Sequence, residues 1–147
     1  MHFEDLSTDF LLGSCSHVRS VGWLAERHAF TTGEAPADLV ALLEEHLEDH
    51  WGIFAMAGCH DCEFCKSAGL RHSDSRNLFI PGPDAVYFVP GMIVHYITRH
   101  RYLPPREFIE ALRTCPPQGS DDFMALMKDV LAWWEVKFPP PPLNQSE

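Results

Sequence analysis

The chain of 147 residues carries 21 acidic side chains against 11 lysines and arginines, a net charge of −10, and 46% of its residues are hydrophobic. This hydrophobic share argues against a disordered chain, and the length suffices for one domain with its own core. No apolar run approaches the roughly 20 residues of a membrane helix, so we expect no membrane span.

The negative charge is concentrated at the start of the chain. The first 58 residues hold ten acids against Arg19 and Arg27, whereas residues 59–113 are close to neutral. A negative surface repels nucleic acid and attracts basic partners. We therefore expect a basic protein partner, and we do not expect nucleic acid.

The start of the chain and its cysteines predict a cytoplasmic protein. Residues 1–5 are acidic and lack the basic start and the apolar stretch of a signal peptide. The five cysteines are an odd number, which does not suit a framework made only of disulfides. In a reducing compartment, clustered cysteines hold metal more often than they form disulfides.

Patterning in the first third predicts an arm, a strand and an amphipathic helix. Residues 1–16 show no clear period and are expected to lie as an irregular arm on the core. A short strand is predicted at 18–24. Pro36 suits the first turn of a helix over 37–50, whose leucines and glutamates face opposite ways.

The middle of the chain combines strands with a polar loop. Residues 51–57 form an apolar run whose length favours a buried strand, and the polar loop that follows extends to about Asn77. Strands are expected at 78–80 and 85–89. The turn Pro81-Gly82-Pro83-Asp84 joins them into an antiparallel hairpin.

The last third is predicted to be helical. Helices are expected at 92–101 and 106–114, each ending before a pair of prolines. Ser120 is a good N-cap for a further helix that continues through Trp134. The prolines at 139–142 predict a polyproline-like ending.

Together these elements predict an α+β fold. We expect a single domain over residues 1–137, with a small antiparallel sheet and three to four helices around a metal-stapled cysteine loop. A disordered proline-rich tail over 138–147 would follow it.

Two short segments concentrate side chains that bind metals. The first is Gly58-Cys59-His60-Asp61-Cys62-Glu63-Phe64-Cys65, and the second holds an H-x4-H pair. Zinc takes about four thiolate or imidazole ligands in a tetrahedron, and a C-x2-C turn presents two thiolates to one ion. We predict one metal ion that joins the two segments, zinc in the first place and iron in the second, because thiolate sites accept both. The candidate ligands are Cys62, Cys65, His95, His100 and His60.

Spacing alone leaves the ligand set open on the cysteine side. Cys59 and Cys62 have the same C-x2-C spacing as Cys62 and Cys65, and His60 stands between them. Cys115 is expected to be a small buried side chain, although it would complete the shell if the prolines after it turned the chain back.

The histidine side of the predicted site has a geometric difficulty. On an ideal helix of 3.6 residues per turn, His95 and His100 diverge by about 140°. The helix must therefore loosen near Arg99, or only one of the two histidines binds.

These segments resemble a family of small uncharacterised bacterial proteins. Its members share G-x-H-x-C-x-x-C and, downstream, a His-Tyr pair, a further histidine and a Y-x-P-P segment. In this chain the motifs lie at 58–65 and 95–105, and the likeness extends from about Val18 to Cys115. The resemblance implies a shared scaffold and suggests the same five ligands, but it supplies no reaction.

Two functions from different classes are open. In the preferred one, four protein ligands close the coordination shell of a structural zinc, and the acidic helix 37–50 docks a basic partner. In the alternative, a zinc-dependent enzyme, three ligands leave one position for water, and His60 or Glu63 is the general base. The chain lacks the H-E-x-x-H and deaminase signatures, so no catalytic residue is assigned. Thiol redox chemistry and nucleic-acid binding rank below both.

Overall fold

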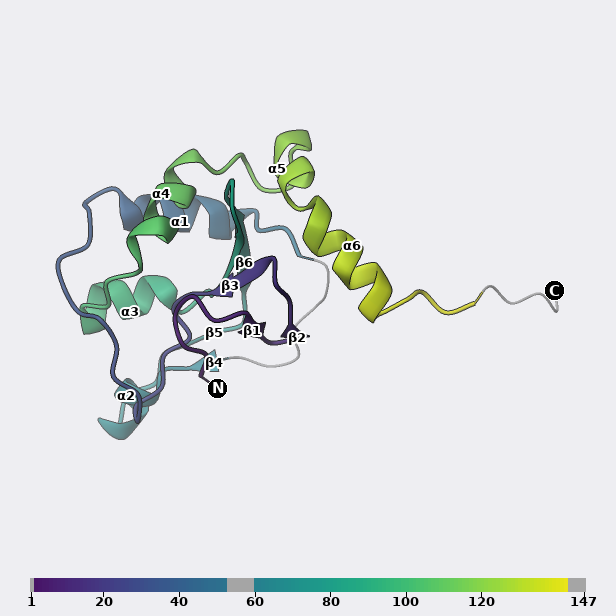
Figure 1. The fold of residues 1–147 in the computed structure, drawn as a ribbon. Helices are drawn as coiled ribbons and strands as arrows, with labels where there is room; N and C mark the ends of the chain where they lie inside the picture. Colours follow the sequence, from purple (N-terminus) through teal and green to yellow (C-terminus); the bar gives the residue numbers. More distant parts are fainter. Residues whose placement is uncertain (1, 53–59, 143–147) are drawn as a thin grey trace.

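A three-stranded sheet lies at the centre of the computed structural model, which describes residues 2–52 and 60–142 (Figure 1). Its strands are β3 (Val18–Ser20), β7 (Val86–Pro90) and β6 (Asn77–Pro81), in that spatial order. β6 and β7 form the predicted antiparallel hairpin. β3 pairs with β7 in parallel, so the sheet is mixed and not wholly antiparallel as predicted. No short turn joins β3 to β7, so nothing constrains that pair to be antiparallel.

Two pairs of two-residue strands lie outside this sheet. β1 (Asp9–Phe10) pairs with β2 (Gly13–Ser14) inside the segment expected to be an irregular arm. β4 (His60–Asp61) pairs with β5 (Ser73–Asp74) and closes the loop that contains the cysteines.

The described residues contain six helices, more than the three to four expected, and the α+β class is confirmed. They are α1 (Leu39–Glu48), α2 (Glu63–Ser67), α3 (Ile93–His100), α4 (Arg106–Thr114), α5 (Asp121–Leu126) and α6 (Lys128–Lys137). The helices predicted at 37–50, 92–101 and 106–114 are confirmed as α1, α3 and α4. The last predicted helix begins where expected, because the Ser120 hydroxyl accepts a hydrogen bond from the Phe123 N–H, but it divides at Met127.

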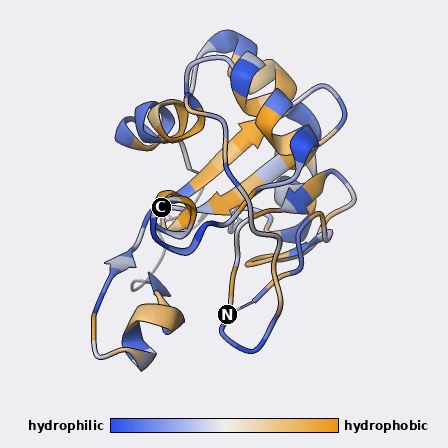
Figure 2. Ribbon diagram, turned by 90° about the vertical axis from the view of Figure 1, so that its left-hand side faces the viewer, coloured by the Kyte–Doolittle hydropathy of each residue, from blue (hydrophilic) through white to orange (hydrophobic). Residues whose placement is uncertain are grey.

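Both faces of the central sheet are covered, and its strands are among the most hydrophobic segments of the molecule (Figure 2). Side chains alternate between the two faces of a strand. Leu78 and Ile80 pack into the core formed with α1, α3 and α4, whereas Phe79 packs with Phe88 against α5 and α6. The continuous apolar run of β6 is therefore the pattern of a strand buried on both sides.

One half-buried carboxylate fastens the N-terminal arm to the end of α3. Asp5 accepts hydrogen bonds from the Tyr102 hydroxyl at 2.7 Å and from the Gly22 N–H at 3.0 Å. Burial raises the pKa of Asp5 above its ordinary value. Since Tyr102 comes directly after α3 and its cap, this contact holds the end of the helix that carries His100.

The strand predicted at 51–57 falls largely on residues 53–59, which lie outside the described residues, and Trp51 and Gly52 belong to no helix or strand. Residues 139–142 have no regular secondary structure. Within the described residues, no helix combines the length and the apolar character that crossing a bilayer requires.

Candidate metal centre

A short helical knuckle presents the two cysteines. Cys62 is the N-cap of α2, and its sulfur accepts a hydrogen bond from the Cys65 N–H at 3.5 Å. The Cys62 N–H donates to the His72 carbonyl at 2.8 Å, which ties the knuckle to the strand that follows it. Capping by a thiol at the first helical turn directs both sulfurs to one side, as in the C-x2-C turns of zinc sites. The cysteine segment, expected to be a loop, is helical here for this reason.

The last turn of α3 is wider than an ideal α-helical turn. The N–H groups of Arg101 and Tyr102 both donate to the Tyr96 carbonyl, over five and six residues instead of four. Arg101 adopts a left-handed conformation with φ of 56°. This is the loosening that two converging histidines require, although it lies just after Arg99, and it brings the rings of His95 and His100 to 5.0 Å between centroids.

The knuckle and α3 bring four ligand atoms together. The Cys65 sulfur lies 3.4 Å from His95 Nε2 and 3.5 Å from His100 Nε2, and the Cys62 sulfur lies 3.3 Å from His100 Nε2. One ligand atom from each of the four residues lies within 4.8 Å of the others. Zinc bonds of about 2.0–2.3 Å place ligand atoms at this kind of mutual separation. The cluster can therefore hold a metal ion.

The electrostatics of the cluster favour neutral imidazoles. Burial lowers the pKa of His95 to about 4, and the neighbouring His72, His100 and Arg99 add to this effect. Burial also lowers the pKa of His100. Burial raises the pKa of the Cys62 thiol, so metal binding at neutral pH must displace its proton. An ion at this position compensates for the cost of forming a buried thiolate.

The structure does not bring the other predicted candidates into the cluster. The ring of His60 packs edge-on against Trp23, with 5.0 Å between centroids, and His60 is not one of the four clustered residues. Cys59 lies outside the described residues. The Cys115 sulfur donates to the Pro116 carbonyl at 3.3 Å and takes no part in the cluster.

Two residues beside the cluster, His72 and Phe64, were not identified from the sequence as part of the site. The ring of His72 stacks on His95 with 4.4 Å between centroids, and the ring of Phe64 lies 5.0 Å from that of His100. No spacing rule marks His72, because the pairing of β4 with β5 places it there. Glu63, considered above as a general base, accepts a hydrogen bond from the Glu26 N–H at 3.1 Å.

Single replacements by alanine are expected to show that His100 binds the metal and that His60 does not. His100→Ala should lose most of the bound metal, since its Nε2 lies near both sulfurs. His60→Ala should keep one ion per chain and lose about 1–3 kcal/mol of stability from the space left beside Trp23. Elemental analysis of the purified variants checks both results. Metal loss in His60→Ala with retention in His100→Ala would reverse the assignment.

The elements and the cluster define the class of this protein: a small α+β domain with a Cys2His2 cluster that can hold a metal ion. Residues 1–113 match the model of the family described as "Domain of unknown function (DUF7919)". This match spans most of the chain, so the chain belongs to that uncharacterised family. The match does not test the motifs on which the sequence resemblance was based. The matched region includes all four cluster residues and ends before α5. No curated protein and no solved structure matches the chain.

Proposed function

We propose that this protein is a zinc-stapled domain whose acidic α1 surface binds a basic protein partner. The observation that carries the proposal is the convergence of two thiols and two imidazoles, from segments thirty residues apart, within 4.8 Å. Four such ligands complete a tetrahedral shell, which is the composition of structural zinc sites. An ion held there would join the knuckle to α3 and contribute directly to the free energy of folding.

The composition of the cluster supports zinc ahead of iron. Two sulfurs and two imidazole nitrogens form a common structural zinc set, whereas iron–sulfur sites more often use four thiolates. The sulfur atoms are well shielded, with Cys62 1% and Cys65 5% exposed. Such burial suits a structural ion, which needs no contact with solvent.

An enzymatic role finds less support at this site. Catalytic zinc keeps a coordination position open for water. Here four protein groups converge, and neither candidate general base is among them: the Glu63 carboxylate accepts a hydrogen bond from the Glu26 N–H, and the His60 ring packs on Trp23. The arrangement thus favours a structural ion over a reactive one.

The acidic surface of α1 is the part of the molecule proposed to bind the partner. Glu44, Glu45, Glu48 and Asp49 are all exposed, and they lie in the second half of the helix or at its C-cap. Negative charge at a helix C-terminus opposes the helix dipole and costs stability. The first turn of α1, where acids would stabilise the helix, holds none. Because acidic side chains at this end of α1 do not stabilise the helix, binding of a basic partner explains their position better.

Two measurements on purified protein test this function. X-ray absorption should show one zinc per chain with two sulfur ligands at about 2.3 Å and two nitrogen ligands at about 2.0–2.1 Å. An oxygen in place of one of these ligands would favour the enzymatic alternative. A lysine-rich peptide should bind, with an affinity that falls steeply as salt rises, because exposed charges are screened. Binding that salt leaves unchanged would contradict an electrostatic surface.

A further inference from the structure

A cleft of about 360 Å³ opens between the second half of α1 and the metal cluster. One wall carries Glu44 and Glu48, which are four residues apart and therefore on the same side of the helix. The opposite wall includes the cluster residue His95 together with His72. Ligand pockets span about 300–1,000 Å³, so this cleft lies at the small end of that range and has room for one long amino-acid side chain.

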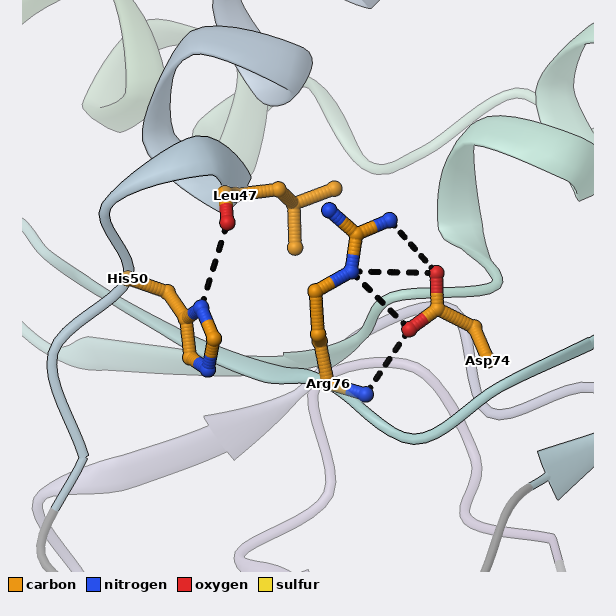
Figure 3. A network of polar contacts seen from close by, with 4 residues as sticks. All are labelled: Leu47, His50, Asp74 and Arg76. Carbon is orange, nitrogen blue, oxygen red and sulfur yellow. Dashed lines mark hydrogen bonds and ion pairs between the residues drawn. The ribbon is translucent and has the colours of Figure 1, made fainter.

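The fixed charges of the cleft are predominantly negative. Arg76 is its single basic residue of the lysine or arginine type, and three hydrogen bonds of 2.6–3.2 Å join its side chain to the Asp74 carboxylate. Figure 3 shows this guanidinium turned to the Asp74 carboxylate. Glu44 and Glu48 make no salt bridge among the described residues, although Glu44 is close enough to Arg76 for its charge to favour the guanidinium. Because Arg76 and Asp74 neutralise each other, the charges of Glu44 and Glu48 leave the cleft negative overall.

The backbone holds the Arg76–Asp74 pair in place. The Gly91 N–H donates to the Arg76 carbonyl at 2.7 Å, and a side chain on Gly91 would meet Asp74 at 2.5 Å. The guanidinium of Arg76 is thus occupied by the Asp74 carboxylate and does not bind an anion. A negatively charged ligand has no free counterpart in this cleft.

The remaining lining is apolar and suits the stem of a long basic side chain. Leu47 and Met92 are buried, and Val94 is half-buried at the start of α3. Lysine and arginine place their methylene groups on apolar surface while the charged head reaches carboxylates. A bare metal ion fits less well, because the metal cluster is the only group of three or more potential ligands among the described residues.

We infer that this cleft receives one arginine or lysine side chain of the protein partner, with Glu44 and Glu48 binding its charged head. The inference rests on the proposed function and specifies where on α1 the partner is recognised. It also links the two parts of that function, because His95 belongs to the Cys2His2 cluster and lines the cleft at the same time. An ion in the cluster would fix the wall against which the side chain packs.

Titration of the zinc-loaded full chain with three tripeptides tests the inference. The probes are N-acetylated, C-amidated Gly-Arg-Gly, Gly-Lys-Gly and Gly-citrulline-Gly, followed through the amide resonances of Ser73, Gly91 and Val94. The arginine and lysine probes should shift these resonances. The citrulline probe, which has the shape of arginine without its charge, should bind at least about tenfold more weakly, as expected for the loss of two modest ion pairs.

Two double variants, each of which removes two negative charges, show which acidic residues bind the arginine probe. Glu44→Gln with Glu48→Gln should weaken arginine binding about tenfold, because both changes lie in the cleft. Glu45→Gln with Asp49→Asn should change it by less than about twofold, because these residues are exposed outside it. Glutamine and asparagine retain side-chain size, so both proteins should fold.

The possible results separate this inference from the function beneath it. If both double variants weakened binding of the arginine probe equally, the cleft would not be the binding site. The acidic surface of α1 as a whole would then be the binding site. Equal affinity for the arginine and citrulline probes would contradict recognition of a positive charge in the cleft. Amide resonances that do not shift with the arginine probe would contradict binding there. Zinc content and salt-dependent binding of the lysine-rich peptide, measured on the same proteins, report on the proposed function independently.

Discussion

Replacing Cys65 by serine is expected to remove the metal ion and to destabilise the domain more than any other single change. The Cys65 sulfur lies within 3.5 Å of the Nε2 atoms of both His95 and His100, whereas, of these two histidines, the Cys62 sulfur makes such a contact with His100 alone. A serine hydroxyl stays protonated at neutral pH and does not replace a thiolate on zinc.

The size of this effect follows from what a structural ion contributes. Zinc supplies about 10–16 kcal/mol in zinc-finger peptides, which have little core of their own. This domain has a core, so we expect a smaller loss of about 5 kcal/mol or more. Since about 1 kcal/mol corresponds to about 2–4 °C in a domain of this size, the thermal midpoint should fall by roughly 10 °C or more.

Circular dichroism melts and metal analysis check the prediction, with Cys115→Ser as the matched control. Cys115 is half-buried, lies outside the cluster, and has a thiol whose pKa burial raises to about 12, so it should bind no ion. The control should keep its metal and lose little stability. If Cys65→Ser melts together with the control and retains its ion, the four clustered residues do not form a metal site.

Replacing Trp23 by alanine is expected to have the second largest effect, about 3–5 kcal/mol. Its indole is 2% exposed and stacks on Phe88 with 5.3 Å between ring centroids. The indole N–H donates to the Phe88 carbonyl at 3.0 Å. Alanine removes the packing and the hydrogen bond together. Phenylalanine restores most of the packing, so Trp23→Phe should cost only about 1–2 kcal/mol.

Urea unfolding followed by circular dichroism measures these losses, and Trp134→Ala is the control of the same residue type. Trp134 lies in α6, is partly exposed and makes a tilted ring contact with Phe138, so its loss should cost about 1 kcal/mol or less. Trp23→Ala should still hold one ion per chain, because Trp23 contacts His60 and supplies no ligand. Loss of the ion in this variant would mean that the metal centre depends on the core behind β4.

The elements that could be predicted from sequence are those determined by nearby residues. The hairpin of β6 and β7 follows from two apolar runs around Pro81-Gly82-Pro83-Asp84, and α1 follows from the spacing of its leucines. The hydroxyl of Ser120 marks the start of α5 because an N-cap acts within three residues. Each of these signals is complete within a short stretch of chain, so no knowledge of the rest of the fold is needed.

The sequence by itself determined the α+β class and the two segments that carry the thiols and imidazoles. Only the tertiary structure decided that Cys62, Cys65, His95 and His100 converge, because their meeting depends on the widened last turn of α3 and on the packing of distant elements. It also turned His60 toward Trp23 and brought His72 onto His95 through the pairing of β4 with β5. The parallel pairing of β3 with β7 is decided at the same level. Residue spacing describes reach along a chain, whereas a coordination shell requires distances across the fold.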